Sequence, residues 1–195
     1  MAGTGSPGVP LVLIEAAAPA MHHKPHQVES VEALHTAALR ALMRRAHSVH
    51  EMKKTLERRC QDTDLVEAEL VRLKQQNLLD DARYARDFAR ARAAGRRQGR
   101  TRIAQELRRR GVPDRHIDTA LDEAFATHDE EALLRERLER KLRSLRGPLD
   151  QKRLASLYRT LLRAGFSSDQ VRKAIHTVAR DRSFESEAQM ADQEQ

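Results

Sequence analysis

The chain has 195 residues and a formal net charge of +7; 33% of its residues are charged and only 3% are aromatic. This length suits one or two domains, and any core must be built from Leu, Ala, Val and Ile, as in helical arrays. The single cysteine, Cys60, excludes an intramolecular disulfide and a multi-cysteine metal site. It fits a reducing, cytoplasmic setting, and the basic excess favours an acidic partner such as a nucleic acid.

Residues 1–30 predict a disordered leader. Their apolar run at residues 9–14 is much shorter than the roughly 20 residues that span a bilayer. Glu15 follows the run directly and no basic segment precedes it, so we expect neither a secretory signal nor a membrane partner. Three histidines of the leader could bind a metal weakly, but a flexible tail without a specific role is the simpler interpretation.

From residue 31 onward, apolar residues recur with the periodicity of amphipathic helices. Superposing the chain on itself aligns three segments with periods of 51 and then 54 residues, and the aligned residues are Met52, Leu56, Val66 and Leu70; Ile103, Leu107, Ile117 and Leu121; and Leu157, Leu161, Val171 and Ile175. The pattern predicts an all-α, elongated array of three tandem three-helix repeats that share apolar faces.

We call residues 31–79 repeat 1, residues 80–127 repeat 2 and residues 128–182 repeat 3. Their formal charges are +2, +4 and +6, and residues 183–195, with a charge of −4, predict a disordered acidic tail.

Capping residues mark the expected helix ends. The run from Ser48 to Glu51 is a capping-box sequence, and Asp80 is a good N-cap for the next helix. Gly111 and Gly165 fall at equivalent stops, where a left-handed residue closes a helix. Cys60 stands at that same place in repeat 1, so it is either strained by about 1 kcal/mol or sits in a rearranged loop.

The best candidate binding element is a set of basic residues in repeats 2 and 3. We expect the arginines from Arg96 to Arg102 to flank two glycines, Gly95 and Gly99, in an exposed loop that is open to phosphates or acidic side chains. A solvated, solubilising surface is the plainer alternative for any single arginine, and Glu–Arg pairs within one helix explain part of the third repeat's charge. The candidate residues are Arg96, Arg97, Arg100, Arg102, Arg108, Arg109, Arg140, Lys141 and Arg143.

Tyr84 and Phe88 share one helical face, which Ala91 continues. These aromatic rings could stack on bases, but packing in the core is the favoured interpretation.

Enzyme motifs are missing from the sequence. His47 and His50 lie three apart, yet no carboxylate or cysteine pattern completes a zinc motif, and no glycine loop has the ending of a phosphate-binding motif. We therefore expect a binding protein without a cofactor, rather than an enzyme.

Three stretches of the chain resemble the RecX family, the regulators of the bacterial RecA recombinase. They are residues 38–48, residues 78–88 with their Leu-Leu-Asp-Asp block, and residues 102–112. The similarity extends over about residues 34–180 and is strongest in the first two repeats. Cys60 and Asn77 depart from the family's usual glycine.

The resemblance implies a non-enzymatic regulator that lies in the groove of the RecA–single-stranded DNA filament and mostly inhibits RecA ATPase, strand exchange and coprotease activity. It also implies a monomer that binds DNA only weakly and without sequence preference. Two alternatives stay open: a direct DNA-binding transcriptional or nucleoid regulator, because three-helix units also place helices in the major groove, and a structural adaptor whose charge serves solubility.

Overall fold

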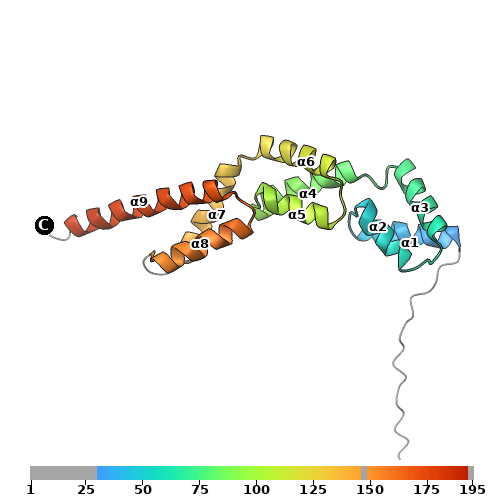
Figure 1. Ribbon diagram of the computed structural model, residues 1–195, viewed down its shortest axis with the longest axis horizontal. Helices are drawn as coiled ribbons and strands as arrows, with labels where there is room; N and C mark the ends of the chain where they lie inside the picture. The colour runs from blue at the N-terminus through green and yellow to red at the C-terminus, as the bar shows by residue number, and fades with distance from the viewer. Residues whose placement is uncertain (1–29, 146–148, 193–195) are drawn as a thin grey trace, which may run out of the picture.

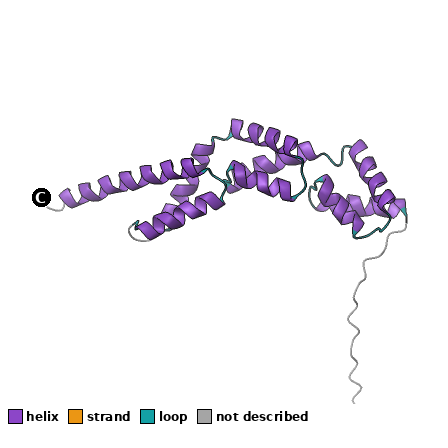
Figure 2. Cartoon of the chain, viewed as in Figure 1, coloured by secondary structure: helices purple, strands orange, loops and turns teal. Residues whose placement is uncertain are grey.

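The computed structural model describes residues 30–145 and 149–192, with side chains through Arg180. Over these residues it contains nine α-helices and no strand, which confirms the all-α prediction (Figure 2). Residues 1–29 of the predicted leader lie outside the described residues.

The helices contact one another mainly within three consecutive groups. Figure 1 shows these groups following each other along the long axis of an arched molecule, so the predicted elongated array is confirmed. The boundaries after residues 79 and 127 stay a prediction. The helices are α1 (Val31–Arg44), α2 (Val49–Glu57), α3 (Thr63–Gln75), α4 (Asp81–Arg96), α5 (Arg100–Arg109), α6 (Asp114–Thr127), α7 (Glu130–Ser144), α8 (Gln151–Arg163) and α9 (Ser168–Asp192).

The aligned apolar positions form the core. All of them are buried except Ile175, which is half-buried. The buried residues of repeat 1 form one hydrophobic cluster, whereas those of repeats 2 and 3 form a second, continuous cluster. The expectation that neighbouring repeats share apolar faces therefore applies to the second pair of repeats and much less to the first.

The buried stripe of α4 consists of Ala85, Ala89 and Ala93. Small side chains let two helix backbones approach closely, and α4 packs chiefly against α6, which buries alanines of its own. Tyr84 and Phe88 lie beside this stripe and pack against the core, but Ala91 is exposed. Ala91 lies in the same helix one turn beyond Phe88, as expected, but the alanine stripe, not the aromatic face, packs against α6.

Left-handed backbone closes several helices. Asn77, Gly111 and Gly165 have φ angles of 55°, 71° and 96°, and the two glycines stand at the helix ends that the sequence predicted. Cys60 is not left-handed: its amide donates to the Leu56 carbonyl at 2.9 Å and its side chain is buried in the core of repeat 1. The loop is thus rearranged around Cys60, and no conformational strain arises there.

Helix α9 continues to Asp192, through most of the segment for which a disordered tail was predicted. Residues 183–192 contain neither glycine nor proline and include Glu, Ala, Gln and Met, which all favour helix. Helical propensity therefore accounts for the continuation where apolar periodicity gave no signal.

Candidate functional site

Consecutive repeats are joined by a carboxylate at the start of each following repeat. Asp81 Oδ1 accepts a hydrogen bond from the Val49 amide at 2.9 Å, and Glu130 Oε1 accepts one from the Arg100 amide at 2.9 Å. Each acid is the first residue of its helix, and each amide belongs to the first residue of the preceding repeat's second helix. One repeat thus caps the helix of another.

The Leu-Leu-Asp-Asp block carries the first of these junctions. Leu79 is buried in the core of repeat 1, and Asp80 caps α4 by accepting from the Ala82 and Arg83 amides. Asp81 then reaches back to α2. The two acids that follow one another in sequence therefore cap helices in two different repeats.

A second contact recurs at both junctions. Ser48 Oγ donates to the Arg110 carbonyl at 2.5 Å, and the equivalent residue Gly99 donates its amide to the Ala164 carbonyl at 2.9 Å. Beside these carbonyls, a Cβ added to Gly111 would overlap the His50 side chain, and one added to Gly165 would overlap Arg102. The repeats therefore stack head to tail in the same way twice.

The segment from Arg96 to Arg102 is not the exposed loop that the sequence predicted. Gly99 is buried against repeat 3, and Arg97 closes α4 in the left-handed conformation at φ 47°. Arg97 Nε donates to Glu136, and the Arg96 and Arg97 carbonyls accept from Arg137 Nη1 at 2.6 and 3.3 Å. Repeat 3 covers the connection, so Gly99 serves close packing instead of loop mobility, whereas Gly95 lies exposed within α4.

Ion pairs engage four of the nine candidate residues. Besides Arg97, these are Arg100, with Nη1 2.9 Å from Asp122 Oδ1, Arg102, with Nε 2.9 Å from Glu106 Oε1, and Arg108, with Nε 2.7 Å from Asp114 Oδ1. Exposed ion pairs contribute little stability, but they orient these guanidinium groups along the protein's own surface.

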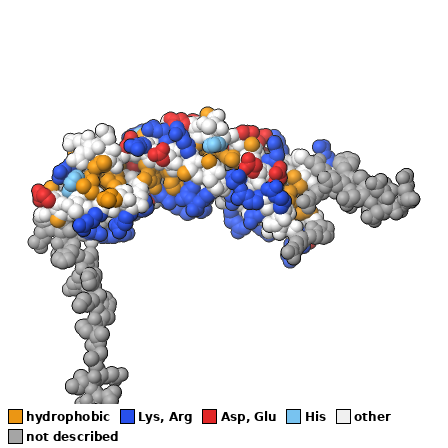
Figure 3. All heavy atoms as spheres, turned by 180° about the vertical axis from the view of Figure 1, so that it is seen from behind, with side chains coloured by type: hydrophobic (Ala, Val, Ile, Leu, Met, Phe, Trp, Pro, Cys, Tyr) orange, Lys and Arg blue, Asp and Glu red, His pale blue; other side chains and the backbone are white. Residues whose placement is uncertain are grey.

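The other five candidate residues are exposed, and none makes an ion pair within 4.0 Å to another residue of the described ranges. Figure 3 shows Lys and Arg side chains along the lower edge of one face and over repeat 3. These residues lie in two groups. Arg96 ends α4 beside α7, the helix that carries three of the five, whereas Arg109 ends α5 near the first junction. These five are Arg96, Arg109, Arg140, Lys141 and Arg143.

The aromatic pair is packed within the protein. Tyr84 and Phe88 stack with their ring centroids 6.0 Å apart, and the guanidinium groups of Arg92 and Arg110 lie 4.7 and 4.6 Å from the Phe88 centroid. Both rings are half-buried against the core. This arrangement supports the core interpretation over base stacking.

Glu51 holds a polar network at the first junction. Its carboxylate lies 2.9 Å from Arg45 Nη1 and 3.9 Å from Arg110 Nε, and the Tyr84 hydroxyl donates to it at 3.4 Å. Burial raises the pKa of Glu51, but hydrogen bonds from Arg45 and the Ser48 amide outweigh this effect and leave the pKa below its usual value. The capping-box pattern predicted Glu51 at a helix start, but not its contact with repeat 2.

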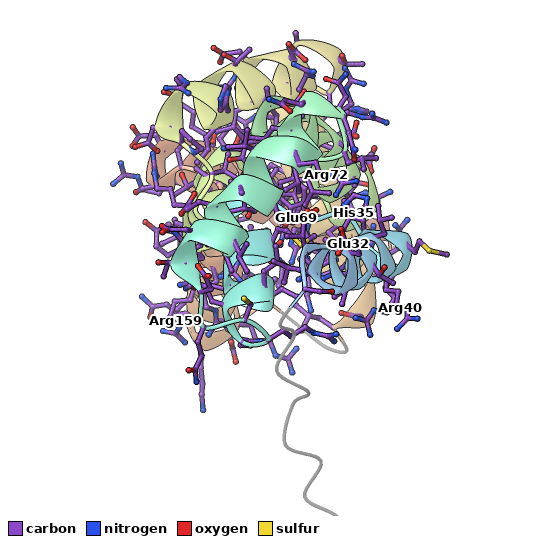
Figure 4. All side chains as sticks on the ribbon, turned by 90° about the vertical axis from the view of Figure 1, so that its right-hand side faces the viewer. Glu32, His35, Arg40, Glu69, Arg72 and Arg159 are labelled. Atoms are coloured by element: carbon purple, nitrogen blue, oxygen red, sulfur yellow. The ribbon has the colours of Figure 1, made fainter. Side chains whose placement is uncertain are left out.

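Repeat 1 also contains a buried carboxylate that the sequence analysis missed. Glu69 is 2% exposed, and His35 Nδ1 donates to its Oε1 at 2.7 Å, whereas Oε2 has no hydrogen-bond partner among the described residues. Figure 4 shows Glu69 and His35 side by side between α3 and α1, with Arg40 on the outer side of α1. Its place within an apolar helical stripe could have revealed Glu69 as a buried polar position.

Metal binding finds no support in the described part of the chain, where no three His, Cys, Asp or Glu residues come close enough to hold an ion. His47 is buried, and its Nδ1 pairs with the Arg45 carbonyl at 2.9 Å; burial lowers its pKa. Among the same residues, no helix is long and apolar enough to cross a membrane.

These helices and their head-to-tail junctions define a three-unit helical-repeat protein. Two family models match it: the second three-helix domain of RecX over residues 80–121, and the third over residues 129–175. The chain is 40% identical over 151 residues to Regulatory protein RecX of Halorhodospira halophila, covering 77% of this chain and 91% of that protein. It is 32% identical over 150 residues to Regulatory protein RecX of Chlorobaculum tepidum, with the same coverage of both chains.

Solved structures show the same fold. The crystal structure of RecX from Lactobacillus salivarius aligns with a TM-score of 0.61 at 18% identity, over 76% of this chain and 96% of that one. A crystal structure of regulatory protein RecX aligns with a TM-score of 0.65 at 25% identity, over 74% and 72% of the two chains. The chain belongs to the RecX family of regulatory proteins.

Proposed function

We propose that this protein binds the RecA–single-stranded DNA filament as a monomer and mostly inhibits RecA ATPase, strand exchange and coprotease activity. Its membership of the RecX family supports this role. The observation that carries the proposal is the placement of exposed, unpaired basic side chains on two successive repeats of an elongated array. Such an array makes several weak contacts along one extended partner, and their combined strength exceeds that of any one contact.

The contacts to the filament are assigned to the candidate residues that make no ion pair. A guanidinium group already paired with a carboxylate must give up that pair before it binds a phosphate. We therefore place the main contacts at Arg96, Arg109, Arg140, Lys141 and Arg143 and give Arg97, Arg100, Arg102 and Arg108 a supporting role within the fold.

The decisive experiment measures the DNA-dependent ATPase of RecA on single-stranded DNA while this protein is titrated below the RecA concentration. Substoichiometric inhibition is the expected result. No effect on the ATPase, together with tight and sequence-dependent binding to duplex DNA alone, would instead identify a direct DNA-binding regulator.

Charge reversal tests the assignment of residues. Replacing Arg109, Arg140 and Arg143 together with Glu is expected to weaken filament binding at least about tenfold at fixed salt, because phosphate and carboxylate contacts are lost and repulsion is added. A control for charge reversal elsewhere on repeat 2 is Arg83→Glu, an exposed arginine outside the set. Equal affinity of the triple variant and the control would refute the assignment.

A further inference from the structure

A groove of about 1000 Å³ lies between α8 and α9 on repeat 3. Among the described residues that line it, none is Asp or Glu. The floor is apolar and consists of Leu154, Ala155, Tyr158 and Ile175. The rim is basic and carries Arg159 and Lys173.

Two apolar positions of the groove are buried where they recur in repeat 2. Ile175 is equivalent to Leu121 and Tyr158 to Ala104, and these two residues of repeat 2 are only 6% and 7% exposed. Repeat 3 contacts repeat 2 at the start of α5, where the Arg100 amide donates to Glu130 and the Thr101 amide donates to the Gly165 carbonyl. Arg100 and Thr101 are equivalent to Leu154 and Ala155 of the groove. No fourth repeat is among the described residues, and Ile175 and Tyr158 are only half-buried. The groove therefore adjoins the part of repeat 3 that corresponds to the site on repeat 2 where the next repeat docks.

A second copy of this chain does not match the groove. The receiving face at each junction meets a helix that begins with Asp81 or Glu130, whereas α1 begins with Val31 after Ser30. The incoming repeats also present a left-handed glycine, and repeat 1 has Cys60 there with its side chain in its own core. Repeat 1 lacks both features of an incoming repeat.

We infer that this groove binds an amphipathic helix of another protein, one with an apolar edge flanked by acidic side chains. The apolar floor takes the edge, beside the start of α8, and the start of α5 is where repeat 2 receives the following repeat. The exposed Arg159 and Lys173 then face the acidic flanks, and the described lining residues include no carboxylate that would oppose those flanks. This inference concerns a surface other than the basic set assigned to the filament and does not depend on that proposal.

The test uses a fluorescein-labelled helical peptide with leucines at i, i+4 and i+7 and glutamates on both flanks. Fluorescence anisotropy with the full chain is expected to show saturable binding. A peptide of identical composition with its leucines spread around the helix, and one with lysine in place of glutamate, are each expected to bind at least about tenfold more weakly.

Two variants locate the binding. Ile175→Glu places a charge on the floor, and Arg159→Glu with Lys173→Glu reverses the exposed rim without touching the core; each is expected to lower affinity at least about tenfold. Arg83→Glu is the matched control and is expected to bind normally. Circular dichroism checks that each variant is folded, and the rim variant tests the inference even if Ile175→Glu unfolds repeat 3.

Three results would overturn the inference. The first is unchanged affinity of the acidic peptide for the rim variant. The second is no saturable binding of that peptide while single-stranded DNA or phosphatidylglycerol vesicles bind in a rim-dependent way. The third is a dimer, detected by light scattering, that the rim variant abolishes, since a second copy would then occupy the groove.

Discussion

Gly165→Ala tests the junction between repeats 2 and 3. Gly165 has a φ of 96°, and a Cβ there would overlap the backbone nitrogen and Cβ of Arg102. The left-handed backbone alone costs a non-glycine residue about 1–2 kcal/mol. Because the overlapping atoms are largely backbone, the docked helices must also separate, and we expect a total loss of about 2–4 kcal/mol.

Urea unfolding measures the total, and amide hydrogen exchange measures the junction itself. The Gly99 and Thr101 amides donate to the Ala164 and Gly165 carbonyls at 2.9 and 3.3 Å. If the junction loses about 2 kcal/mol, these two amides should exchange about thirtyfold faster.

Gly95→Ala is the matched control for this substitution. Gly95 lies within α4, and an added Cβ would have nothing within 4 Å, so alanine should stabilise the helix by about 0.5–1 kcal/mol. The reasoning fails if Gly165→Ala is as stable as the unaltered protein and the Gly99 and Thr101 amides keep their protection.

Three further predictions concern acids of the fold. Asp81→Ala should cost about 1 kcal/mol in urea unfolding, because it removes the cap on the Val49 amide of the preceding repeat; no loss would contradict the shared cap. The pKa of Glu51 is lowered in the folded protein, so its contribution is present above the ordinary carboxyl pKa of about 4.3 and is lost as the pH falls through the folded value. Melting temperatures between about pH 6 and pH 3 should therefore fall more steeply for the unaltered protein than for Glu51→Gln, and parallel curves would refute this. Glu69→Ala should cost about 1–3 kcal/mol, because it opens a cavity beside an unpaired His35, whereas Glu69→Leu should cost less in the same assay; the reverse order would show that the His35 bond itself stabilises the repeat.

The sequence predicted the helices and the core well because both follow from local periodicity. Met52, Ile103 and Leu157 share one spacing pattern, and each occupies the buried side of its repeat's second helix. Caps such as Asp80 and Gly111 could be predicted equally well, since each acts within a few residues of its own position.

The contacts between repeats could not be predicted in the same way. A chain with 36 basic and 29 acidic residues allows very many pairings, and nothing local indicates that Arg97 pairs with Glu136 or that Asp81 caps α2. Arg97 also adopts a left-handed conformation that glycine usually supplies, so a search for glycines places the end of α4 near Gly95 or Gly99. For the same reason, the paired and unpaired arginines of the candidate surface could not be told apart.

The two separate hydrophobic clusters have a mechanical consequence. Repeats 2 and 3 share one continuous core, so bending between them must deform packed side chains, which resist compression. Repeat 1 has its own core and meets repeat 2 largely through capping bonds and the Glu51 network. We expect the protein to behave as a rigid arm of two repeats with a hinge before it. Such a molecule adapts to the shape of an extended partner by turning at one joint.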